Sequence, residues 1–102
     1  MSDKLFLFRL LPPRADFAQT MTPDEQDAMA RHAAYWQELM GAGCVVVYGP
    51  VADPEGVWGL GVVRAGSQAE VVELAEKDPV IAAGIATFDV AEIMGGITGR
   101  PP

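Results

Sequence analysis

The chain has little cysteine and little histidine: one of each in 102 residues. A lone cysteine excludes an intramolecular disulfide and a cysteine-rich metal site, and it fits a reducing compartment. Because three valines follow Cys44, we interpret it as a buried, inert thiol rather than a nucleophile. A metal site would have to be built from scattered carboxylates around a single histidine, so we expect no bound metal.

Basic residues and long apolar runs are also scarce. Seven Lys and Arg residues against fourteen Asp and Glu residues give a formal net charge of -7. This charge repels the phosphates of nucleic acids and of anionic membranes, so neither is an expected partner. No apolar run approaches the roughly 18 residues that span a bilayer, and the N-terminus does not show a signal-peptide pattern. We therefore expect a cytoplasmic protein.

The sequence does contain enough apolar material for one hydrophobic core. Half of the residues are hydrophobic and 21% are charged, a balance that is typical of folded chains rather than disordered ones. The length suits one domain and is too short for two. We predict a single domain over residues 1–97, followed by a loose tail at residues 98–102.

The clearest predicted element is a helix that carries the only histidine. Thr22 supplies its N-cap, Pro23 takes the first helical position and Glu25 completes a capping box. Apolar residues then recur at spacings of three and four until the glycines at positions 41 and 43, which is one face of an α-helix. His32 lies on this apolar face and is therefore expected to point toward the sheet.

The whole chain predicts the order strand, helix, strand, strand, helix, strand. The expected strands are residues 4–11, 44–51, 57–64 and 85–94, and the second helix, with a capping box at Ser67 and Glu70, runs from there to about Lys77. The apolar residues within 14–21 follow no clear periodic pattern, so we predict a loop there. For residues 80–84 we predict a turn or a single helical turn. The order is that of the ferredoxin-like βαββαβ fold, an α+β fold with an antiparallel sheet and both helices on one face.

Two strand features go beyond this topology. Gly59 and Gly61 lie on one face of their strand, which leaves space above the sheet or allows another group to approach closely. Residues 4–11 and 44–51 are apolar on both strand faces, whereas two helices cover only one face of a sheet. We therefore expect a second copy of the chain to cover the other face, in a homodimer packed sheet to sheet.

Several features, taken in order, resemble the YCII (YciI-like) family. They are the helical His32, Gly49-Pro50 after the second strand, Asp53 and Gly56 in the next turn, Ser67 with Glu70, and Asp78-Pro79 followed by Ala83-Gly84. The resemblance covers nearly the whole chain and implies a dimeric α/β barrel without a cofactor. The helical His and the Asp of the Asp-Pro pair are the proposed active-site residues of that family, which implies catalytic roles for His32 and Asp78. One related activity is a dehydrochlorinase acting on a chlorinated hydroxyquinol.

His32 and Asp78 are suited to acid/base chemistry. An imidazole accepts and donates a proton near neutral pH, and a carboxylate bonded to its other nitrogen fixes the tautomer. We therefore predict a small homodimeric enzyme that performs proton abstraction or elimination, as a lyase does, on a small metabolite. The alternative function is a non-catalytic small-ligand-binding or accessory domain that modulates a partner protein. Both residues also have structural interpretations. His32 is then a buried histidine whose hydrogen bonds only stabilise the fold, and Asp78 is the residue that ends a helix before Pro79.

Four further residues are candidates for substrate binding: Arg9, Trp36, Gly49 and Pro50. The guanidinium of Arg9 suits a bidentate contact with an anionic substrate, but a salt bridge with Asp89 on the neighbouring last strand is the favoured alternative. Trp36 is expected either to line a small aromatic pocket with Tyr35 and Trp58 or to belong to the core.

Overall fold

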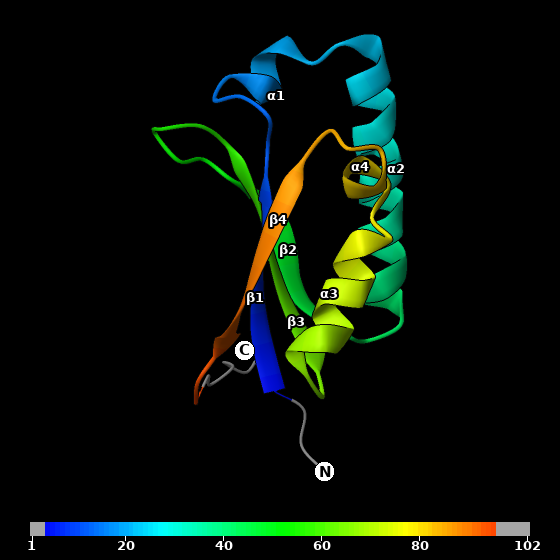
Figure 1. The fold of residues 1–102 in the computed structure, drawn as a ribbon, viewed down its shortest axis with the longest axis vertical. Coiled ribbons are helices and arrows are strands. Elements are labelled where there is room, and N and C mark those ends of the chain that lie inside the picture. The colour runs from blue at the N-terminus through cyan, green and yellow to red at the C-terminus, as the bar shows by residue number, and fades with distance from the viewer. Residues whose placement is uncertain (1–3, 96–102) are drawn as a thin grey trace, which may run out of the picture.

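A computed structural model describes residues 4–95 of the chain. The elements are β1 (Lys4–Leu11), α1 (Phe17–Thr20), α2 (Pro23–Gly41), β2 (Val45–Val51), β3 (Trp58–Ala65), α3 (Gln68–Glu76), α4 (Pro79–Ala82) and β4 (Thr87–Ile93). Helices α2, α3 and α4 lie together on one side of the four-stranded sheet (Figure 1). This is the predicted ferredoxin-like α+β fold. The tail expected at residues 98–102 lies outside the described residues.

The sheet has the strand order β2-β3-β1-β4, and every neighbouring pair is antiparallel. β1 therefore lies inside the sheet with a neighbour on each side. A strand rich in Phe and Leu favours such a buried position. Its side chains alternate, so Phe6, Phe8 and Leu10 are buried beneath the helices and the residues between them are only half-buried. At the sheet edge, Val47 is 45% exposed. In the single chain, the side of the sheet without helices is thus left partly open, as the sequence predicted.

The helix α2 begins where the sequence predicts. The Thr22 hydroxyl accepts a hydrogen bond from the Glu25 N–H, and the Glu25 carboxylate accepts one from the Thr22 N–H, which completes the capping box. At α3 only half of the predicted box forms. Ser67 accepts from the Glu70 N–H, but the Glu70 carboxylate accepts from Gly66 N–H at 3.0 Å instead. Ser67 itself has an extended backbone, and the N–H that Glu70 binds belongs to the residue before it.

The prediction of a loop over residues 14–21 is wrong in part, because Phe17–Thr20 form the single-turn helix α1. One turn is too short to show a 3.6-residue period, so the pattern could not reveal it. Tertiary contacts hold it: Phe17 is buried, and the Arg14 guanidinium donates to the Thr20 carbonyl at 2.8 Å and to Glu25 at 2.7 Å. Of the two alternatives predicted for residues 80–84, the single helical turn is confirmed, as the short helix α4.

The core lies between the sheet and the helices, and Trp36 of α2 is one of its largest members at 2% exposure. Its indole packs against Phe8, with ring centroids 4.8 Å apart. A Cβ atom at Gly61 would lie 2.9 Å from the indole ring, so the absent side chain there makes room for it. No helix within residues 4–95 has both the length and the apolarity that crossing a membrane requires.

Candidate functional site

Packing of α2 against the start of α4 brings together a histidine and an aspartate that are 46 positions apart. His32 Nδ1 lies 2.6 Å from Asp78 Oδ2. The Asp78 side chain is completely buried, and the His32 side chain is 16% exposed. Asp78 is also the N-cap of α4, where its Oδ1 accepts a hydrogen bond from Val80 N–H at 3.1 Å. The cap therefore fixes the carboxylate that faces the imidazole.

The Asp78 carboxylate is surrounded by donors. Its Oδ2 accepts a second hydrogen bond, from Trp36 Nε1–H at 2.8 Å. An indole N–H and a backbone N–H can only donate, so both carboxylate oxygens act as acceptors and His32 Nδ1 donates as well. In the neutral imidazole this arrangement leaves the lone pair on Nε2. The site thus selects the tautomer in which Nε2 is a base.

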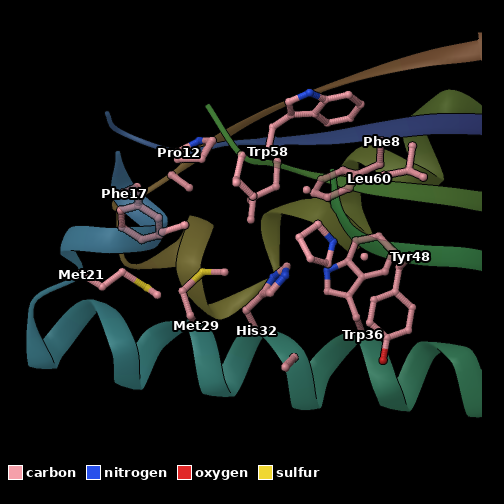
Figure 2. Close-up of a pocket in the computed structure, with 18 residues that line it drawn as sticks. Phe8, Pro12, Phe17, Met21, Met29, His32, Trp36, Tyr48, Trp58 and Leu60 are labelled. Carbon is pink, nitrogen blue, oxygen red and sulfur yellow. The ribbon is translucent and has the colours of Figure 1, made fainter. Parts of the chain in front are cut away.

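The other imidazole nitrogen faces a cavity of about 330 Å³ between α2, the strands and α1. Nε2 has no hydrogen-bond partner among residues 4–95. Every side-chain nitrogen or oxygen of those residues that is buried does have a partner, so Nε2 is not buried. Nε2 must therefore be open to the cavity. Figure 2 shows His32 rising from α2 into this space, with Phe17 and Met29 to one side and Trp36 and Tyr48 to the other.

The cavity is almost wholly apolar. Its lining residues are Phe8, Leu10, Pro12, Phe17, Ala18, Met21, Met29, His32, Ala33, Trp36, Tyr48, Gly49, Pro50, Val57, Trp58, Gly59, Leu60 and Ala86. The Trp36 Nε1–H donates to Asp78 at 2.8 Å, and the Tyr48 hydroxyl donates to Gln37 at 2.8 Å, so the polar atoms of these two side chains have partners. Trp58 and Leu60 are lining residues whose side chains point to the open side of the sheet, where the Arg9 guanidinium lies 5.8 Å from the Trp58 ring centroid. His32 Nε2 is consequently the side-chain nitrogen of the cavity wall that has no hydrogen-bond partner among the described residues.

Two comparisons with known proteins bear on this site. The model of the YCII-related domain family matches residues 9–94. The chain belongs to this family. The fold of the chain is similar to that of 5-chloro-2-hydroxyhydroquinone dehydrochlorinase from Burkholderia phenoliruptrix, whose structure was solved in complex with 2,5-dihydroxybenzoquinone. The similarity has a TM-score of 0.67 at 23% sequence identity and covers 90% of this chain and 95% of the other. A search of the curated proteins finds no match.

In this YCII-related domain, three of the four predicted substrate-binding residues lie at the cavity. Trp36 comes from α2, and Gly49 and Pro50 come from β2. The other two aromatic residues considered with Trp36 do not place their rings in the cavity: Tyr35 is not among the lining residues, and the Trp58 side chain points to the open side of the sheet beside Arg9. The Tyr35 hydroxyl donates to the Leu74 carbonyl at 2.7 Å, and burial raises its pKa.

Arg9 is the predicted residue that the fold does not bring to His32. Residues alternate along β1, so Arg9 points to the open side of the sheet, away from the helices. There its Nε donates to Asp89 at 2.9 Å, in the salt bridge that the sequence offered as the alternative role. This hydrogen bonding lowers the pKa of Asp89 and raises the pKa of Arg9. Among residues 4–95, no arginine lines the cavity of the YCII-related domain, so none of them offers a guanidinium to an anionic substrate there.

The sequence did not indicate the residues that close the far end of the cavity. Phe17 and Met21 lie in the segment expected to be a loop, and no local pattern marks them as lining residues. Met29 and Tyr48 could have been found. Met29 precedes His32 by three residues on the same helical face, and Tyr48 directly precedes Gly49-Pro50. Among the described residues, no group of three or more His, Cys, Asp or Glu side chains is placed to hold a metal ion.

Proposed function

We propose that this YCII-related domain is an enzyme in which His32 is a general base acting through Nε2. One observation carries the proposal: Nε2 faces an apolar cavity and has no hydrogen-bond partner among the described residues, while Nδ1 lies 2.6 Å from the buried Asp78 carboxylate. A histidine with a structural role alone needs no access to a cavity of about 330 Å³. A histidine that acts as a base needs one ring nitrogen free and the other held in a fixed orientation.

The chemistry that this arrangement supports is proton abstraction or elimination. A proton of the substrate would pass to Nε2, and the positive imidazolium formed would be stabilised by Asp78 at its other nitrogen. In an elimination, the electron pair left by that proton forms a double bond, and the leaving group departs with the electrons of its own bond. The Asp78 carboxylate stays in place during the reaction, since Trp36 and Val80 also hold it.

The lining favours a small, largely apolar substrate. The cavity wall includes the aromatic rings of Phe8, Phe17, Trp36 and Tyr48, and no Lys, Arg, Asp or Glu is among the described lining residues. Such a wall suits the faces of a ring compound, whose acidic O–H or C–H would meet Nε2. The dehydrochlorinase with the similar fold is named for a ring compound of this kind, 5-chloro-2-hydroxyhydroquinone. This compound is therefore the first substrate to test.

The test compares wild type with His32→Ala, and Tyr35→Phe serves as a control on the same helix outside the cavity. Chloride release from 5-chloro-2-hydroxyhydroquinone is measured first, and a thermal-shift screen of small metabolites on the same proteins extends the search. We expect His32→Ala to lower turnover by roughly 10²- to 10⁴-fold, as loss of a general base does. Its thermal midpoint should stay close to that of wild type. A large loss of stability with no change in turnover or in any ligand response would contradict the proposal.

A second candidate function is binding without catalysis, as an accessory domain that modulates a partner protein. The observation in its favour is that the cavity carries a single reactive group, which is enough to anchor a ligand. In that case the screen finds a ligand that His32→Ala binds more weakly, and no product forms from it in the wild type.

We also propose that the domain acts as a homodimer. The open side of the sheet carries half-buried apolar residues of β1 and β3, such as Leu5, Leu7, Leu60 and Val62, and the exposed Val47 of β2. An apolar sheet face of this kind is stabilised by a second sheet packed on it.

A further inference from the structure

Trp36 and His32 contact the same atom. They are one turn apart on α2, so their side chains lie on one face of the helix and converge on Asp78. Oδ2 of that residue accepts from His32 Nδ1 at 2.6 Å and from Trp36 Nε1 at 2.8 Å. Two donors on one oxygen compete for its charge, so each hydrogen bond is weaker than it would be alone. The indole therefore limits how strongly the carboxylate attracts the Nδ1 proton.

The position of the indole is set from the opposite side by the sheet. A Cβ atom at Gly61 would lie 2.9 Å from both Cη2 and Cζ3 of Trp36, and Phe8 and Tyr48 pack on the same ring system. A contact below 3.0 Å cannot persist, and a rigid indole has no flexible end that could move aside. The glycine thus allows the indole to sit at the depth where Nε1 reaches Asp78.

We propose that Trp36 is a positioning residue for the His32 base: its indole N–H shares Asp78 Oδ2 with the imidazole, and Gly61 keeps the indole at the required depth. This inference rests on the proposed function of His32 as a base, because it explains how the strength of that base is set. A carboxylate that holds Nδ1–H more tightly makes the imidazolium more stable and its return of the proton slower. Sharing Oδ2 therefore favours a base that both takes up and releases a proton.

The only histidine of the chain makes the test direct, since its Nδ1–H proton gives a single resonance in a ¹⁵N-histidine-labelled NMR sample. Trp36→Phe keeps an aromatic ring and removes the donor. Oδ1 remains bound to Val80 N–H in a fully buried site, so the carboxylate stays in place. The His32–Asp78 bond should then strengthen, and the Nδ1–H resonance should move downfield. Gly61→Ala should move it in the same direction by a smaller amount, because it displaces the indole.

Two control variants separate this effect from a general loosening of the fold. Tyr35→Phe removes another hydrogen bond of α2, and Gly66→Ala places a Cβ atom directly after β3, 3.2 Å from the Glu70 carboxylate and outside the cavity. Tyr35→Phe should lower stability, and both variants should leave the resonance where it is in the wild type.

An unmoved or upfield resonance in Trp36→Phe overturns the inference. If that variant does not fold, the resonance of Gly61→Ala decides by the same rule. Failure of the proposed function would be seen elsewhere, in unchanged turnover and binding by His32→Ala, a variant that this spectrum does not use. The two proposals can therefore fail separately.

Discussion

At Asp78, one buried carboxylate accepts hydrogen bonds from an imidazole, an indole and a backbone N–H. An asparagine in its place offers one oxygen to these three donors and turns an NH₂ group toward at least one of them. We expect Asp78→Asn to lower the free energy of unfolding by about 3 kcal/mol, since buried donors would be left unpaired. Urea unfolding measures this loss.

The matched control for that prediction is Asp89→Asn. Asp89 also accepts hydrogen bonds from a side chain, the guanidinium of Arg9, but 46% of its own side chain is exposed. Its substitution should cost no more than about 1 kcal/mol, because solvent screens the pair and replaces its hydrogen bonds. Equal losses for the two variants would show that Asp78 is not the buried anchor described above.

Among the elements, α1 depends on a single arginine. Arg14 binds both oxygens of Glu25 at the start of α2, at 2.7 and 3.0 Å, and its guanidinium lies 5.2 Å from the Phe17 ring centroid. Hydrogen bonds lower the pKa of Glu25 from 4.5 to about 2, and those from Arg14 contribute more than the one from Thr22 N–H. The folded state therefore favours the carboxylate form of Glu25. The hydrogen bonds to this carboxylate contribute their full stability above pH 4.5, and that stability is lost as the pH falls toward 2.

Arg14→Met should therefore raise the pKa of Glu25 toward its ordinary value, with Thr22 still holding part of the shift. The stability difference between wild type and variant should be largest above pH 4.5 and should shrink as the pH falls to 2. Urea unfolding at a series of pH values measures the difference, and carboxyl NMR follows Glu25 directly. A difference that stays constant over this range would refute the link between Arg14 and Glu25.

For the whole molecule, the homodimer proposal predicts a mass twice the 10.8 kDa of the chain. Leu7 lies opposite Val62 and Ala91, near the middle of the open sheet side. Leu7→Glu should halve the mass measured by light scattering, because a charge would be buried between two sheets. The same substitution at Ala34, which is exposed on α2, should leave the mass unchanged. A monomeric mass for the wild type at micromolar concentration would refute the proposal.

The sequence by itself determined the features that depend on neighbours in the chain. Thr22 and Glu25 mark the start of α2 because a capping box involves only four consecutive residues. The helical period placed His32 on the face that packs on the sheet, and the order of the elements was enough for the fold. The resemblance to the YCII family paired His32 with Asp78, which no spacing in the chain could do.

Only the tertiary structure decided which of these residues meet. The contact between His32 and Asp78 spans 46 positions, and the Trp36 hydrogen bond to the same oxygen spans 42. Such contacts depend on how α2 packs against α4, which local sequence does not encode. The strand register likewise turned Arg9 away from the cavity toward Asp89. The cavity itself, closed by Phe17 from a segment without any period, exists only because distant elements pack around it.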